Sequence, residues 1–76
     1  MKELVYSIAK SLVGNPEMVT VSQTEGHDLS VIELKVAKED IGKVIGKQGR
    51  TATAIRTILA AAAAKSNRRA VLEIIE

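Results

Sequence analysis

The chain has 76 residues, which is enough for one small domain with a thin core. Apolar residues make up 46% of the sequence, too many for a disordered chain. There is no cysteine and only one histidine, so the sequence predicts no disulfide, no metal site and no cofactor. No signal peptide precedes the first predicted helix, and the longest apolar run, Ile58 to Ala64, is too short to span a bilayer, so we expect a cytoplasmic protein.

The net charge of +2 is small, but the charges are unevenly distributed along the chain. The stretch from Ile41 to Arg69 carries seven basic residues and no acidic one. A solvated helix face can produce the same pattern. A basic stretch that surrounds a pair of glycines nevertheless favours an anion-binding surface.

A helix is predicted over residues 2–13. Four apolar residues recur there at helical spacing: Leu4, Val5, Ile8 and Leu12. Gly14 suits the end of this helix, and Pro16 prevents its continuation.

Two strands are predicted next, over residues 17–23 and 29–36, because apolar and polar residues alternate there. Residues 24–28 have turn composition, so the two strands should pair as an antiparallel hairpin. The second strand has an apolar face made by Ile32, Leu34 and Val36.

The C-terminal half predicts a short helix over 38–45, a long helix from residue 50 to about 65, and a strand over 70–75. The long helix is expected to bury one stripe: Ile55, Ile58, Leu59 and Ala62. A helical crossover between strands implies that the last strand runs parallel to a hairpin strand. The predicted class is therefore α+β, in the order α-β-β-α-α-β, with a mixed three-stranded sheet and three helices on one face.

Between the two C-terminal helices lies the sequence Gly46-Lys47-Gln48-Gly49, called the GKQG loop below. Glycine has no Cβ, so another chain can approach closely and positive φ is accessible. The helix that follows begins with unpaired N–H groups and the positive end of its dipole, and both attract anions. These features predict a place where a phosphate backbone lies against the protein backbone.

Catalysis is not expected. The glycine spacing around the loop is too short for a nucleotide-binding P-loop, and Gln48 stands where that motif needs serine or threonine. His27 lies in the predicted turn, and no base is evidently placed to activate a serine. A small-molecule substrate is therefore not predicted either.

The run from Gly42 to Arg50, set between two helices inside a β-α-α-β core, resembles the GxxG motif of KH domains. The extra helix and strand before that core resemble the type II arrangement. Nearly the whole chain is similar to the KhpA (YlqC-like) family of small bacterial proteins with a single KH domain. The resemblance implies one KH domain over residues 1–76, with its core at roughly 29–76.

The resemblance also implies a function. Members of the family are RNA-binding proteins, regarded as RNA chaperones, that act in the cytoplasm. They form homodimers, and heterodimers with a larger KH-domain protein called KhpB, Jag or EloR. The expected role is regulation of cell shape, elongation and peptidoglycan homeostasis (cell wall biogenesis).

The motif implies a set of RNA contacts. The RNA backbone should be held by Gly46, Lys47, Gln48, Gly49, Arg50 and Lys43. The bases should lie in a groove formed by Ile41, Val44 and Ile45 on one side and by Leu34 and Val36 on the other. A second set of contacts is expected in the variable loop, from Lys65, Arg68 and Arg69. Ala52 stands where many KH domains carry isoleucine, so the groove beside the loop should be shallower or partly filled from elsewhere.

Tyr6 is the only aromatic residue, so the chain lacks a platform on which bases could stack. Binding should therefore be weak and modestly selective. If three to five phosphates are neutralised, the log–log dependence of affinity on salt should have a slope of roughly −2 to −3.5.

A second copy of such a weak site would raise avidity. The long helix has small residues away from its buried stripe, and these predict a face for homodimer contact: Thr53, Thr57, Ala60, Ala61 and Ala64. Alanine is also the best helix former, which could explain the same residues without a dimer.

Two other functions fit parts of the sequence. A helix, a short glycine turn and a basic helix also describe a helix-turn-helix that binds duplex DNA. Alternatively, the chain could be a protein-interaction module in which the glycines only make a tight turn.

Overall fold

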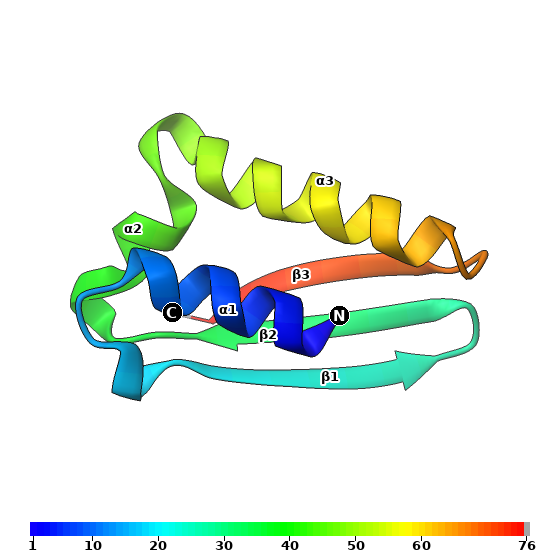
Figure 1. Ribbon diagram of the computed structural model, residues 1–76, viewed down its shortest axis with the longest axis horizontal. Coiled ribbons are helices and arrows are strands. Elements are labelled where there is room, and N and C mark those ends of the chain that lie inside the picture. The colour runs from blue at the N-terminus through cyan, green and yellow to red at the C-terminus, as the bar shows by residue number, and fades with distance from the viewer. Residues whose placement is uncertain (76) are drawn as a thin grey trace.

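A three-stranded sheet and three α-helices make up the computed structural model, which describes residues 1–75 (Figure 1). The helices are α1 (Lys2–Leu12), α2 (Ile41–Ile45) and α3 (Arg50–Ala64), and the strands are β1 (Thr20–Gly26), β2 (Leu29–Lys35) and β3 (Arg69–Ile75). Short 3₁₀ turns occupy Pro16–Met18, Lys38–Asp40 and Lys47–Gly49. This is the predicted α-β-β-α-α-β order.

The strands lie in the order β1-β2-β3. β1 and β2 are antiparallel, with Thr20 opposite Lys35 and Gly26 opposite Leu29. β2 and β3 are parallel, with Leu29 beside Arg69 and Lys35 beside Ile75. The mixed sheet and its parallel last strand are as predicted, because the α2–α3 crossover returns the chain to the start of the sheet.

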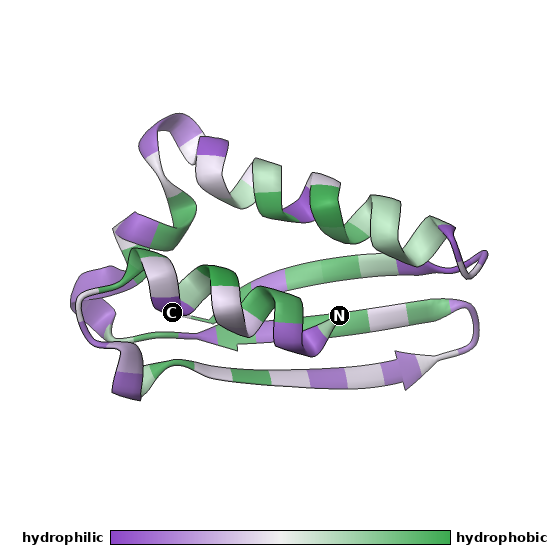
Figure 2. Ribbon diagram, viewed as in Figure 1, coloured by the Kyte–Doolittle hydropathy of each residue, from purple (hydrophilic) through white to green (hydrophobic). Residues whose placement is uncertain are grey.

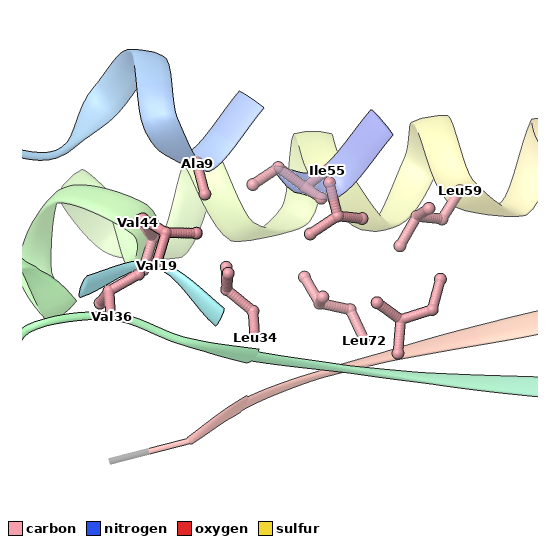
Figure 3. Packing of buried hydrophobic residues seen from close by; sticks show 10 residues of the cluster. Ala9, Val19, Leu34, Val36, Val44, Ile55, Leu59 and Leu72 are labelled. Carbon is pink, nitrogen blue, oxygen red and sulfur yellow. The ribbon is translucent and has the colours of Figure 1, made fainter. Parts of the chain in front are cut away.

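One apolar cluster lies between the sheet and the helices (Figure 3). The strands contribute Ile32, Leu34 and Leu72, and the helices contribute Val5, Ala9, Val44, Ile55 and Leu59. These strand residues share one face by their alternation, so all three helices cover the same side of the sheet. The predicted apolar face of the second strand is confirmed.

The hairpin boundaries differ from those predicted. Glu17 and Met18 belong to a 3₁₀ turn, because Pro16 supplies the φ that a first helical position requires. The strands continue as far as Gly26 and Leu29, so the connecting turn is only His27 and Asp28. Asp28 has φ 60°, a left-handed conformation that aspartate tolerates better than most residues.

The predicted buried stripe of α3 is partly wrong. Ile55 and Leu59 are buried, but Ile58 is 45% exposed and Ala62 only partly buried. The other buried positions are Ala52 and Ala63. The predicted and the observed stripes both contain Ile55 and Leu59, so helical periodicity alone does not distinguish them. The side that carries Ala52 and Ala63 faces the sheet, because small side chains let the helix and the sheet approach closely.

Candidate functional site

The GKQG loop has an unusual backbone. Gly46 has φ 78° and ψ 173°, and Gln48 and Gly49 are both left-handed, with φ 56° and 74°. The Gly46 N–H donates to the Gly42 carbonyl at 2.9 Å, and the Gly49 N–H donates to the Gly46 carbonyl at 3.1 Å. Three positive φ values in four residues turn the chain sharply from α2 into α3.

The two glycines are required for different reasons. A Cβ on Gly46 would come within 2.6 Å of the Thr51 Cβ and 2.8 Å of its amide nitrogen. A Cβ on Gly49 would meet no heavy atom of the described chain within 4 Å. Space above Gly49 is therefore open to a ligand, whereas the space at Gly46 is already filled by Thr51. The expectation that both glycines make room for a ligand is wrong for Gly46.

Cationic and polar side chains surround this open space. Lys47, Gln48 and Arg50 are all exposed. The loop stands at one end of the molecule, above α2, and it is hydrophilic (Figures 1 and 2). Within the described residues, the loop's backbone bonds do not use the Lys47 and Gln48 amides as donors. Both amides are thus available to an anion, together with the N-terminus of α3.

Lys43 is engaged elsewhere. Its ammonium lies 3.1 Å from the Asp40 carboxylate and its side chain is 53% exposed. It is two residues from both Ile41 and Ile45, which places it on the opposite side of α2 from them. Lys43 therefore faces the α1–β1 connection, and its charge is already neutralised in part.

Asp40 is a residue whose role the sequence did not reveal. Its side chain is fully buried, yet it accepts hydrogen bonds from the amides of Gly14 and Asn15 and from the Asn15 side chain, at 3.0 to 3.1 Å. The carboxylate thus ties the end of α1 to the start of α2. The sequence suggested only that Asp40 favoured a helix start, because its partners lie 25 and 26 residues away.

The environment of Asp40 predicts acid sensitivity. Burial raises its pKa, but the hydrogen bonds from Asn15, Gly14 and Lys43 outweigh burial and lower the pKa from 3.8 to about 2. A lowered folded-state pKa contributes stability above pH 3.8 that is lost as the pH falls through about 2. The urea concentration at which half of the protein is unfolded should therefore fall between pH 4 and pH 2 in the parent. Asp40→Asn should have a lower urea midpoint than the parent at pH 7, and its midpoint should change less between pH 4 and pH 2. Exposed Glu39→Gln is the control and should follow the parent; equal slopes in all three proteins would contradict this assignment.

The predicted groove residues separate into two groups. Ile41 and Ile45 are partly buried and lie one turn apart on the same side of α2. Leu34 and Val44 are fully buried among the core side chains of Figure 3, and Val36 is 6% exposed. Leu34 and Val44 therefore support the groove from beneath and present no surface of their own, contrary to expectation.

Burial of Leu34 predicts a stability effect. Leu34→Ala should lower the free energy of unfolding by about 2–5 kcal/mol, because it leaves a cavity in the core. The same truncation at Ile58, which is 45% exposed, should cost well under half as much. Urea denaturation followed by circular dichroism measures both. Similar losses for the two variants would show that Leu34 is not a core residue in solution.

Ile41 and Val36 also meet in a hollow of about 490 Å³ beside the start of α2. Met18, Ala37 and Ile75 complete its apolar walls, and Lys35 and Lys38 line it as well. Sequence reasoning did not find this hollow. Met18 and Ile75 are 57 positions apart in a 76-residue chain, and only the folded sheet brings them together.

The predicted variable-loop contacts lie far from the GKQG loop. α3 has 15 residues, so its two ends are roughly 22 Å apart. Arg68 holds the hairpin: its guanidinium donates to Glu25 at 2.6 Å and to the Leu29 carbonyl at 3.0 Å. Lys65 and Arg69 are exposed at that distant end. The three residues therefore lie about one length of α3 away from the loop and are not adjacent to it.

The small residues of α3 are accessible. The five predicted contact positions are all exposed: Thr53, Thr57, Ala60, Ala61 and Ala64. Exposed Ile58 borders them and adds a large apolar side chain to this surface.

Among residues 1–75, no helix is both long and apolar enough to cross a membrane, and no group of three potential metal ligands occurs.

Comparison with known proteins places these features in a family. The family described as "KhpA/KhpB, KH domain" matches residues 2–74. "RNA-binding protein KhpA" of Caldanaerobacter subterraneus subsp. tengcongensis and its namesake in Clostridium acetobutylicum are each 60% identical over 75 residues, covering 99% of this chain and 100% of theirs. The Treponema pallidum protein of that name is 51% identical, with 99% and 94% covered. No solved structure matched the chain. The chain belongs to the KhpA/KhpB family of KH-domain proteins.

Proposed function

We propose that the protein binds single-stranded RNA by gripping its backbone at the GKQG loop. The observation that carries the proposal is the open space above Gly49, which is bordered by exposed Lys47 and Arg50. The relatives named above are described as RNA-binding proteins, which supports the choice of ligand. KH domains hold about four nucleotides with this type of loop.

The grip combines full and partial charges. Lys47 and Arg50 supply ammonium and guanidinium groups, and the Lys47 and Gln48 amides, which donate no backbone hydrogen bond within the described chain, supply partial positive charge. The positive end of α3 adds to the same field. Because Lys43 is paired with Asp40, we expect about three neutralised phosphates, and a salt slope of about −2.

The bases lie along the strip made by Ile41 and Ile45. This strip is apolar and half-buried, and it runs along α2 up to the loop. Ala52 is 3% exposed, so its side chain lies beneath the surface and adds no wall to the groove beside the strip. Contacts of this kind are van der Waals contacts that any base can make, so selectivity among bases should be modest.

A titration tests the proposal. A short single-stranded RNA, added to isotopically labelled protein, should shift the amide signals of residues 46–50 and bind with a salt slope near −2. Duplex DNA at the same salt concentration is the comparison. Tighter binding to the duplex would favour the helix-turn-helix function, and no binding to either would favour a protein-interaction module.

We further propose that two copies associate through the α3 face defined by Thr53, Thr57, Ala60, Ala61 and Ala64. Small exposed residues allow two helices to approach closely, and Ile58 offers an apolar anchor at the border. Ala61→Glu should convert a dimer to a monomer in sedimentation experiments, whereas Ser7→Glu on α1 should not. An unchanged dimer in Ala61→Glu would exclude this face.

The family resemblance extends the proposal to the cell. We propose that the protein acts as a cytoplasmic RNA chaperone with a larger KH partner of the KhpB, Jag or EloR type. The family description, which joins KhpA and KhpB, supports such a relation. The pathway proposed from the resemblance is control of cell shape, elongation and peptidoglycan homeostasis.

A further inference from the structure

The hollow beside Ile41 opens at the end of α2 that is farthest from the GKQG loop. Its volume, about 490 Å³, falls within the range of small-ligand sites. Its apolar walls come from four segments of the chain: Met18, Val36 with Ala37, Ile41, and Ile75. Lysine is the only charged residue type that lines it within the described chain.

The walls leave apolar surface in water. Met18 is 55% exposed and Ile75 is 37% exposed. Lys35 and Lys38 are exposed beside them. An apolar surface flanked by two cations complements a ligand that has both a flat apolar part and a negative charge, and a nucleotide has both.

The hollow is continuous with the strip on α2. Ile41 lines the hollow, and Ile45, four residues later, is the last residue before the GKQG loop. Four residues of α-helix span about 6 Å. A strand whose bases follow this strip therefore reaches the hollow about one helical turn from the loop.

We propose that the hollow accepts the base of one further nucleotide of the RNA, next to those gripped at the loop. This inference rests on the proposed RNA-binding function. The Met18 thioether packs on the face of the base, because polarisable sulfur makes favourable contacts with aromatic rings. Lys35 and Lys38 bind the phosphate groups on either side of that base as compact point charges.

Oligonucleotide length tests the proposal. The probes are RNAs of four and six uridines, and the variant is Lys35→Gln with Lys38→Gln. One or two lost phosphate contacts should weaken hexamer binding about four- to fifteenfold at 0.15 M salt and reduce the salt slope by about 0.7 to 1.4. Tetramer binding should change by less than twofold. Lys2→Gln with Lys10→Gln, on α1, removes the same charge and should leave both affinities near those of the parent.

A second measurement reports on the hollow directly. The chain has two methionines, so protein labelled at the methionine methyl groups gives one signal from Met18 and one from Met1. The hexamer should shift the Met18 signal and leave the Met1 signal in place, and the tetramer should move neither. A Met18 signal unmoved by saturating hexamer, or equal hexamer affinity in the lysine variant and the parent, overturns the inference alone. If the variant Lys47→Asp with Gln48→Asp still binds the tetramer as the parent does, the proposed RNA binding at the GKQG loop is overturned, and this inference falls with it.

Discussion

RNA affinity should fall about 100-fold when Lys47 and Gln48 are both replaced by aspartate. The change places two carboxylates where the RNA backbone is proposed to lie, and it takes the net charge from +2 to −1, since lysine to aspartate subtracts two charges and glutamine to aspartate subtracts one. Two unit charges about 4 Å apart in water interact by about 1 kcal/mol. Three charge changes near one phosphate therefore amount to about 3 kcal/mol, and 1.4 kcal/mol corresponds to tenfold in affinity.

The measurement is fluorescence anisotropy with a labelled single-stranded RNA at constant salt. The matched control is Lys2→Asp with Ser7→Asp, which changes the net charge equally on exposed positions of α1. Aspartate at position 2 is favourable at the start of α1, and Ser7 is exposed in the middle of that helix, so this control should remain folded. A similar loss of affinity in both variants would mean that net charge, and not the loop, governs binding.

The structure already weighs against one alternative to RNA binding. A helix-turn-helix protein reads duplex DNA through the exposed side chains of its second helix. The second helix here is α3, whose exposed side chains include Arg50 and Arg56 but are otherwise mostly small: Thr53, Ala54, Thr57, Ala60 and Ala61. These small side chains offer few hydrogen bonds to base edges. α2, with five residues, is also short for the helix that crosses the DNA backbone.

The fold could be predicted because its signals are local and agree with one another. The alternation from Leu29 to Val36 defines a strand with one buried face, and the apolar spacing of residues 2–13 defines a helix. Once two helices stand between strands, chain connectivity requires a parallel pair. The errors arose where two patterns competed, as on α3, where hydrophobicity favoured Ile58 and packing selected Ala52 and Ala63.

The site was less predictable, because the roles of its residues depend on distant partners. The sequence shows that Lys43 is basic, but not that Asp40 neutralises it in a network that includes Gly14 and Asn15. Likewise, Leu34 and Val44 read as apolar residues near a groove. Only the packing of α2 against the sheet decides that they lie beneath the surface. Exposure is a property of the assembled layers, which a linear pattern does not contain.

Gly46→Ala should destabilise the protein far more than Gly49→Ala, although the two glycines belong to the same motif. At Gly46 the backbone, with φ 78° and ψ 173°, lies in a region that is essentially restricted to glycine and costs other residues about 1–3 kcal/mol. The added methyl group also collides with Thr51. The combined loss should reach about 3 kcal/mol or more, a large share of the 5–15 kcal/mol typical of a folded domain.

At Gly49 an added methyl group meets only open space within the described chain, so the cost is that of the left-handed backbone, about 1–2 kcal/mol. Gly49→Asn should cost less, since asparagine tolerates this conformation. Both Gly49 variants should stay folded and yet bind RNA less tightly, because their side chains occupy the space proposed for the RNA backbone. Urea denaturation and anisotropy on the same samples separate the two effects.

Thr51→Ala provides a further check on the cause of the Gly46 effect. It removes the Thr51 hydroxyl and γ-methyl groups, but the Thr51 Cβ and amide nitrogen remain 2.6 Å and 2.8 Å from the position of the new methyl group. Stability should therefore not recover in the double variant Gly46→Ala with Thr51→Ala. Full recovery would show that side-chain crowding alone makes Gly46 necessary. Equal stability of Gly46→Ala and Gly49→Ala would contradict the division of roles, and both glycines would then be free to serve the ligand.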